Sequence, residues 1–248
     1  MDRALDNRCE DLSRAASRLR LISAHDALIF LRASFSAPKL LHTLRASPCS
    51  GHPALERFDG LLRSCLCTIS NTDISDIQWI QASLPVRNGG LGIRRVSSLA
   101  PSAFLASAAG TRDIQAKILL NCRATGDSAV DKVLSLWMAS YDQSGISCPS
   151  EENARKQRAW DRSCVSGDVL KLFGSLTDRG DQARLLALSA PHSGDWLNAL
   201  PISSCGLRLD DEAVRVAVGL RLGSTLCEPH QCPCGSHVSP EGTHGLAC

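Results

Sequence analysis

The residues best suited to chemistry gather near the C-terminal end of this chain, within 232–248. Cys232 and Cys234 flank a proline, so a tight turn can aim two thiolates at one point. His244 and Cys248 are four residues apart, a spacing that puts two side chains on one face of a helical turn. Four such ligands are enough to close a tetrahedral structural site. The spacing therefore predicts a zinc knuckle.

Other ligand sets remain open in the same stretch. The gap between Cys232 and Cys234 is tighter than usual in zinc modules, so Cys227 or His230 can replace one of the pair, and His237 is a further candidate. So small a knuckle cannot bury a core and would fold only with metal, whose binding is worth on the order of 10 kcal/mol. Because the chain contains 12 cysteines, a disulfide at its end is the alternative to zinc.

The overall composition predicts a folded, mainly α protein. Of its 248 residues, 44% are hydrophobic and 21% are charged, which suits a chain with a sizeable core. One Tyr and five Phe accompany abundant Leu and Ala, a mixture that packs helices more readily than sheets. The polar N-terminus contains no apolar run of the length of a signal peptide or a membrane span. We expect an intracellular protein of the cytoplasm or nucleus, without membrane contact.

Apolar periodicity predicts the helices that must position these residues. The first has an apolar face formed by Leu5, Leu12, Ala16, Leu19 and Ile22, with Arg14 and Arg18 on its other face. The second opens with a capping box at 23–26 and is apolar nearly all round, at Leu28, Ile29, Phe30, Leu31 and Phe35, which predicts its burial. Further helices are predicted to begin at Pro38, after a break at 47–53, and at 73–83, 96–110, 113–122 and 128–140, with a glycine-rich turn at 84–93 and a hinge near 145–150.

The charge of the chain is uneven. Residues 1–123 contain 16 Lys and Arg against 10 Asp and Glu, whereas residues 124–248 contain 11 against 15. Only five of the 27 basic residues are Lys, and Arg suits bidentate phosphate contacts. The first half therefore offers a face for the backbone of RNA or DNA. The residues predicted to make these contacts, on polar faces or beside the glycine turn, are Lys39, Arg45, Arg87, Arg94 and Arg95.

Several motifs in the first half resemble one family. They are His25-Asp-Ala-Leu-Ile-Phe-Leu-Arg, Ser36-Ala-Pro-Lys-Leu-Leu-His-Thr-Leu-Arg45, Trp79-Ile-Gln-Ala-Ser-Leu-Pro, Gly89-Gly-Leu-Gly-Ile-Arg94 and Leu99-Ala-Pro-Ser-Ala-Phe-Leu-Ala-Ser107. This stretch is similar to the region just after the polymerase core in reverse transcriptases of non-long-terminal-repeat retrotransposons. The resemblance covers roughly residues 20–120 and returns at the C-terminal end.

The resemblance implies an architecture and a partner. It implies a helical, thumb-like bundle over 1–123 that grips template and primer, a helical linker over 124–222 and a zinc knuckle over 223–248. The knuckle ligands Cys232, Cys234, His244 and Cys248 match the family's Cys-Cys-His-Cys order residue by residue. The short first gap and the long middle gap depart from many members. Partners would be RNA or DNA and the remainder of a retrotransposon polyprotein.

Catalytic parts of such a polyprotein are missing from the sequence. A polymerase needs paired aspartates that hold two metal ions about 3.5 to 4 Å apart. The adjacent pair Asp210-Asp211 instead opens a helix-like run, where acids favour the helix dipole. In the family that the motifs resemble, an endonuclease lies beyond the knuckle; we expect neither that activity nor any other enzyme activity from this chain. The sequence thus predicts a nucleic-acid-binding fragment of a reverse transcriptase, and the alternative is a zinc-stapled helical protein-interaction module.

Overall fold

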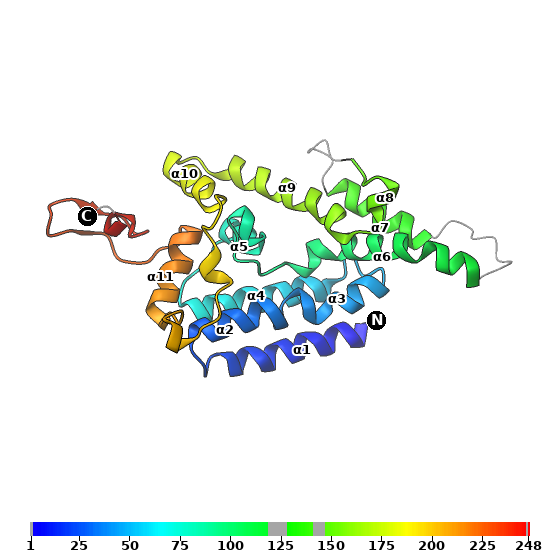
Figure 1. Ribbon diagram of the computed structural model, residues 1–248, viewed down its shortest axis with the longest axis horizontal. Coiled ribbons are helices and arrows are strands. Elements are labelled where there is room, and N and C mark those ends of the chain that lie inside the picture. Colours follow the sequence, from blue (N-terminus) through cyan, green and yellow to red (C-terminus); the bar gives the residue numbers. More distant parts are fainter. Residues whose placement is uncertain (1, 119–127, 141–146, 247) are drawn as a thin grey trace.

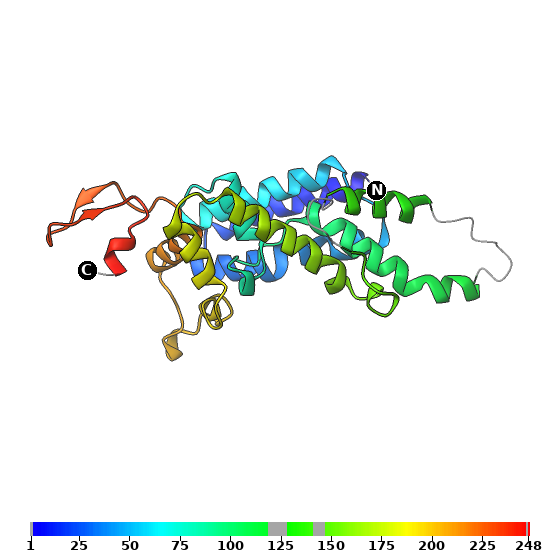
Figure 2. The same ribbon diagram turned by 90° about the horizontal axis from the view of Figure 1, so that it is seen from above.

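A computed structural model describes residues 2–118, 128–140, 147–246 and 248. Its architecture is mainly α, as the sequence predicts: helices form an elongated body, and a small hairpin extends from one end of it (Figures 1 and 2). None of the helices in the described ranges combines the length and the apolarity that crossing a membrane requires.

The N-terminal helices form one side of the body. These are α1 (Asp2–Leu19), α2 (Ala24–Phe30), the π-helical turn η1 (Leu31–Phe35), α3 (Ala37–Ala46) and α4 (Pro53–Ser70). Ser23 caps α2 by accepting a hydrogen bond from the Asp26 backbone N–H, as the capping-box pattern predicts. Pro38 lies in the first turn of α3, where its missing N–H costs nothing. Helix α1 packs on α4, and α3 packs on α6.

The glycine-rich turn joins α5 (Asp76–Ser83) to α6 (Val96–Ile118) through the 3-10 turn η2 (Val86–Asn88). A side chain at Gly90 is impossible without movement, because its Cβ would lie 2.1 Å from the Leu84 carbonyl oxygen. The turn thus permits close backbone approach, as predicted. The start of α6 is fixed by the buried Asp59 of α4, whose carboxylate accepts hydrogen bonds from the Val96 N–H (2.7 Å) and the Ser97 N–H (3.1 Å). Burial raises the pKa of Asp59 to about 6, against the opposing effect of these hydrogen bonds.

The second half adds α7 (Ser128–Ala139), α8 (Glu151–Ala154), α9 (Gln157–Ser175), α10 (Arg179–Leu188) and α11 (Asp211–Leu222), with 3-10 turns η4 (Asp195–Leu197) and η5 (Ser203–Cys205). The predicted break between helices at 110–113 was wrong, because α6 continues through it to Ile118. The rest of the helix predicted at 113–122, and part of the hinge predicted near 145–150, lie outside the described residues.

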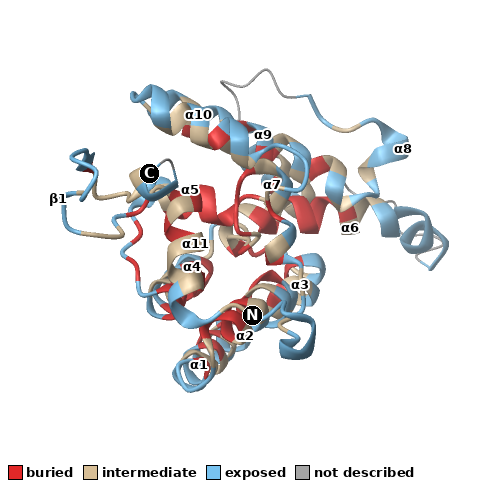
Figure 3. Ribbon diagram, turned by 60° about the vertical axis from the view of Figure 1, so that its left-hand side comes forward, coloured by how far each residue is buried: buried red, intermediate tan, exposed pale blue. Residues whose placement is uncertain are grey.

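The buried core is shared between the two predicted helical regions. One cluster joins side chains of α1 to α6 with Val214, Val218 and Leu222 of α11. A second cluster joins α6 and α7 with α9, where Trp137 and Trp160 meet edge to face at 5.1 Å between ring centroids. In Figure 3 the buried segments accordingly lie on the faces of the helices that point toward neighbouring helices. The domain boundary predicted at 123 falls among residues that the structure does not describe, and it stays a prediction.

Candidate metal centre

The first pair of ligands sits on the tip of the C-terminal hairpin. Strands β1 (His230–Gln231) and β2 (His237–Val238) pair antiparallel. The turn between them is closed by hydrogen bonds from the Gly235 N–H to the Cys232 carbonyl (2.8 Å) and from the Cys232 N–H to the Ser236 carbonyl (2.9 Å). Gly235 has φ of +88°, a conformation that favours glycine. The turn therefore holds Cys232 and Cys234 close together, as the sequence predicts.

The second pair comes from the short helical turn that follows the hairpin. Turn η6 spans Thr243–Leu246, and the Cys248 N–H donates to the His244 carbonyl at 3.0 Å, which continues the helical path to the last ligand. Gly242, with φ of +67°, reverses the chain just before it. The four-residue spacing of His244 and Cys248 thus has the helical origin that the sequence indicates.

The four side chains converge on one point. The Sγ atoms of Cys232 and Cys248 are 3.6 Å apart, and the Sγ of Cys234 is 3.2 Å from the Nε2 of His244. One ligand atom from each of the four residues lies within 4.8 Å of all the others. A tetrahedral zinc ion with ordinary bond lengths requires ligand separations of about 3.5 to 3.8 Å. The two separations of 3.6 and 3.2 Å are close to this range, so these three cysteines and one histidine could hold a metal ion such as zinc.

The hydrogen bonds within the cluster shift the pKa values of two of its thiols in opposite directions. Hydrogen bonding from Ser236, with smaller effects from Cys232 and Cys248, lowers the pKa of the Cys234 thiol to about 6. Hydrogen bonding with the neighbouring Cys232, and then with Cys234, raises the pKa of Cys248. A cation placed among them stabilises all three thiolates, because metal binding displaces their protons. All cysteines in the described part of the chain are free.

The comparisons with known proteins add no family to this geometry. Neither a scan against protein-family models nor searches of curated proteins and of solved structures found a match. The chain is thus established as a mainly helical protein whose C-terminal Cys-Cys-His-Cys cluster could hold a metal ion such as zinc.

The three spare candidates lie outside the cluster. The Cys227 thiol donates instead to the carbonyls of Ser239 and Pro240, at 3.5 and 3.7 Å. His230 is exposed, with its Nδ1 2.9 Å from the Glu228 carbonyl oxygen, and the exposed His237 stands opposite Gln231 in the hairpin. The geometry therefore favours the first ligand set over replacement by Cys227 or His230.

The knuckle is anchored to the helical body at α11. A Cβ on Gly219 would lie 2.2 Å from a methyl carbon of Leu226, so the missing side chain makes room for that leucine. The Arg215 guanidinium donates to the Leu226 carbonyl at 3.1 Å, and the N–H groups of Leu226 and Cys227 both donate to the Pro240 carbonyl. These contacts tie the start and the middle of the knuckle to one helix.

The five predicted phosphate contacts occupy two kinds of environment. Arg94 and Arg95 are largely buried and form ion pairs across to α9, with Asp161 and Asp168. Their charges are therefore neutralised and shielded.

The other three predicted contacts are more available. Arg45 is exposed and donates to the neutral amide of Gln157 at 2.8 Å, and the exposed Arg87 makes a long contact of 3.4 Å with Asn88. Lys39 keeps 35% of its side chain exposed, 3.9 Å from Asp11. The structure thus gathers Arg94 and Arg95 at one helix interface and leaves the other three on separate surfaces.

The aspartate pair has a structural role, as the helix-start interpretation predicts. Asp210 caps α11 by accepting a hydrogen bond from the Ala213 N–H at 2.7 Å. Asp211 accepts one from the Ala24 N–H at 2.8 Å and so connects α11 to the start of α2. Both carboxylates are engaged with backbone N–H groups.

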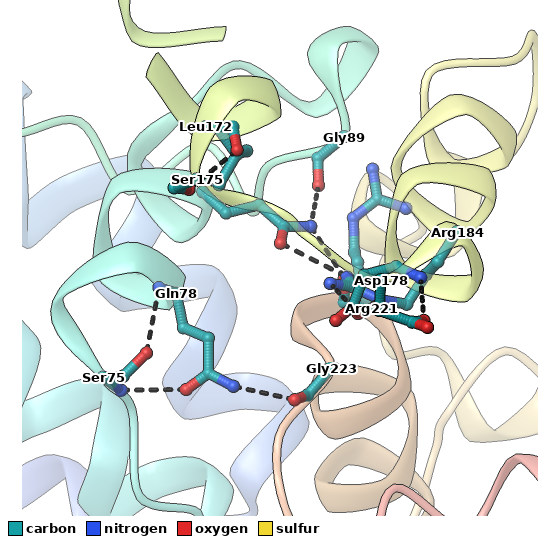
Figure 4. Close-up of polar contacts among 11 residues, drawn as sticks. Ser75, Gln78, Gly89, Leu172, Ser175, Asp178, Arg184, Arg221 and Gly223 are labelled. Carbon is teal, nitrogen blue, oxygen red and sulfur yellow. Dashed lines mark hydrogen bonds and ion pairs between the residues drawn. The ribbon is translucent and has the colours of Figure 1, made fainter. Parts of the chain in front are cut away.

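Sequence reasoning missed the buried Arg221 of α11. Its guanidinium donates to three backbone carbonyls, those of Gly90 (3.0 Å), Ser193 (3.0 Å) and Val86 (2.9 Å). Its own carbonyl accepts a hydrogen bond from the Arg184 guanidinium at 2.6 Å, and Figure 4 shows Arg184 and Arg221 side by side near Gly223. A usable signal was present, because position 221 falls on the apolar stripe of 214, 218 and 222.

Proposed function

We propose that this chain is a nucleic-acid-binding part of a non-long-terminal-repeat retrotransposon reverse transcriptase, with a zinc knuckle and without polymerase activity of its own. The observation that carries the proposal is the convergence of Cys232, Cys234, His244 and Cys248, the ligand order of the family that the sequence motifs resemble. The order of a helical body followed by a knuckle supports it further. Zinc fixes the fold of the knuckle in this proposal.

The helical body, rather than the knuckle, carries the phosphate contacts in this proposal. Residues 223–248 contain no Lys or Arg but do contain Glu228 and Glu241. Three zinc-bound thiolates exceed the charge of the ion by one, so the loaded knuckle is negatively charged. Phosphates repel such a surface, and binding through counterion release needs cations. Arg45 and Arg87 are exposed cations of the body and are suited to this contact.

Binding is expected to weaken steeply with salt, and the dependence should report which cations take part. Changing Arg45 and Arg87 together to Gln should lower the slope of log affinity against log salt by about 1.4 to 1.8 on RNA or DNA, since each phosphate contact contributes about 0.7 to 0.9. Fluorescence anisotropy across a salt series measures it.

The matched control changes Arg94 and Arg95 to Gln. It removes the same net charge, but those guanidinium groups are paired with Asp161 and Asp168. We expect a lower melting temperature and an almost unchanged slope. Equal slopes for wild type and the Arg45/Arg87 variant would remove these two residues from the interface.

The second candidate function is a zinc-stapled helical protein-interaction module. The absence of Lys and Arg from residues 223–248 favours it, because a knuckle of this charge suits a protein surface better than a phosphate backbone. Absence of binding to both structured RNA and duplex DNA at low salt would select this candidate over the first.

The chain is expected not to incorporate nucleotides on a primed template with magnesium or manganese. Polymerisation needs two carboxylates free to hold a pair of metal ions, and Asp210 and Asp211 are occupied by backbone N–H groups. A primer-extension assay on RNA and DNA templates tests it, with a known polymerase as positive control. Template-dependent extension that survives further purification would contradict the proposal.

A further inference from the structure

A concave surface lies between α1 and the segment from α2 to α3. We call it the α1–α3 groove; it has a volume of about 430 Å³, and it is lined by Arg14, Arg18, Ile22, Phe30 and Lys39 among others. Phe30 is 48% exposed, although the sequence pattern predicted burial of the second helix. Ile22, predicted on the apolar face of the first helix, is 43% exposed. Figure 1 shows α1 running along α2 and α3 on this side of the body. Two aromatic rings, the half-exposed Phe30 and the partly buried Phe35, thus share one hollow with three cations.

The groove is positively charged on balance. Asp11 is the one acidic residue in its lining among the described residues. Its carboxylate is shared by three cations, Arg14 at 2.5 Å, Arg8 at 3.3 Å and Lys39 at 3.9 Å. One negative charge cannot neutralise three positive ones. Arg18 is exposed and forms no ion pair within the described ranges, so it adds a further cation.

We propose that the α1–α3 groove binds single-stranded nucleic acid. Phosphates lie against Arg14, Arg18 and Lys39, and one base stacks on the exposed ring of Phe30. The inference rests on the proposed function and assigns it a surface and a strand type. A base in a duplex is already stacked and paired, whereas an unpaired base has a free face for an aromatic side chain.

The spacing of the cations suits a strand that runs along the groove. Arg14 and Arg18 are four residues apart and lie on one face of α1, one helical turn from each other. Lys39 lies across the groove on α3, and the exposed His42 follows about one turn later on the same helix. Guanidinium groups bind phosphates and also stack on bases, so the arginines of α1 can contact both the phosphate and the base of a nucleotide.

The test compares two triple variants of equal charge. The groove variant is Arg14→Gln, Arg18→Gln and Lys39→Gln; the control is Arg112→Gln, Arg158→Gln and Arg162→Gln, at exposed positions of α6 and α9. On a fluorescein-labelled oligouridine strand, the groove variant should bind at least about tenfold more weakly at low salt, with a salt slope lower by about 2. The control variant should lose much less.

The variant Phe30→Leu separates stacking from charge. It keeps an apolar side chain but removes the aromatic face, so affinity for oligouridine should fall about tenfold with an unchanged salt slope. Circular dichroism and thermal melting identify any variant that has lost its fold. If the triple variant does not fold, the single variants Arg14→Gln and Arg18→Gln replace it. Both positions lie on the exposed face of α1.

The outcomes separate the groove from the proposed function. Wild-type binding with equal losses in the groove and control variants overturns the groove and leaves the proposed function standing. Wild type that binds neither RNA nor DNA overturns both. Equal losses on oligouridine and on a duplex overturn the assignment to single strands. Tight binding of an acidic amphipathic peptide that oligouridine cannot displace assigns the groove to a protein partner.

Discussion

Changing Cys234 and Cys248 together to Ser is expected to lower bound zinc from about one ion per chain to none. Each change removes a thiolate from a cluster whose ligand atoms lie within 4.8 Å of one another, and two ligands cannot close a tetrahedral site. Binding at such structural sites is worth on the order of 10 kcal/mol, so the loss should be complete at ordinary zinc concentrations. Metal analysis of protein dialysed against a mild chelator measures it.

Cys227→Ser is the matched control, because it makes the same change in the same knuckle at a thiol that bonds to carbonyl groups. It should retain its zinc. Wild-type zinc content in the Cys234/Cys248 variant would make the ligand set wrong, and loss of zinc from the control would bring Cys227 into it. The helical body should keep its circular dichroism without zinc, since Val238 is the one buried hydrophobic side chain in the described residues of the knuckle.

Arg221→Met is expected to lower the free energy of unfolding by about 3 kcal/mol or more. The change keeps an apolar stem but leaves the carbonyls of Gly90, Ser193 and Val86 without their donor, and each buried unpaired group costs about 1 to 3 kcal/mol. Burial, with a smaller effect from Arg32, lowers the pKa of Arg221 to about 10, so the group is charged at neutral pH. Urea denaturation at pH 7 measures the difference.

Two further variants isolate the cause. Arg221→Lys keeps the charge but lacks the fork of donors that reaches three acceptors, so it should lose nearly as much stability as Met. Arg215→Met in the same helix removes a guanidinium that is paired mainly with the exposed Glu212, and it should cost under about 1 kcal/mol. An Arg221→Met protein as stable as Arg215→Met would show that the three hydrogen bonds contribute little.

The features that could be predicted from the sequence are those set by residues close together in the chain. The start of α3 at Pro38, the cap of α2 at Ser23 and the convergence of Cys232 with Cys234 each depend on residues within a few positions of one another. Apolar periodicity likewise located α1 and α4, because one face of each packs against the other. The four candidate metal ligands belong to this group, since a turn and a helical spacing are enough to position them.

The features that could not be predicted from the sequence depend on pairing between residues far apart in the chain. Arg94 meets Asp161, and Arg95 meets Asp168, across more than sixty residues of sequence. A polar-face pattern does not distinguish an arginine exposed to solvent from one that pairs with another helix. Phe30 shows the converse case: its segment is apolar nearly all round, yet no helix in the described part of the chain covers the ring. Which faces meet is a property of the tertiary packing.

Helix α11, near the C-terminal end of the chain, completes the hydrophobic core of the N-terminal helices. Val214, Val218 and Leu222 complete a core that otherwise comes almost entirely from the first hundred residues, and the segment 202–208 before α11 is exposed. A protease that cuts this segment would therefore yield two pieces that stay together without a covalent link. If the two pieces were prepared separately and mixed, we expect them to assemble as a split protein. The C-terminal piece would contain both the knuckle and α11, the helix that completes the core.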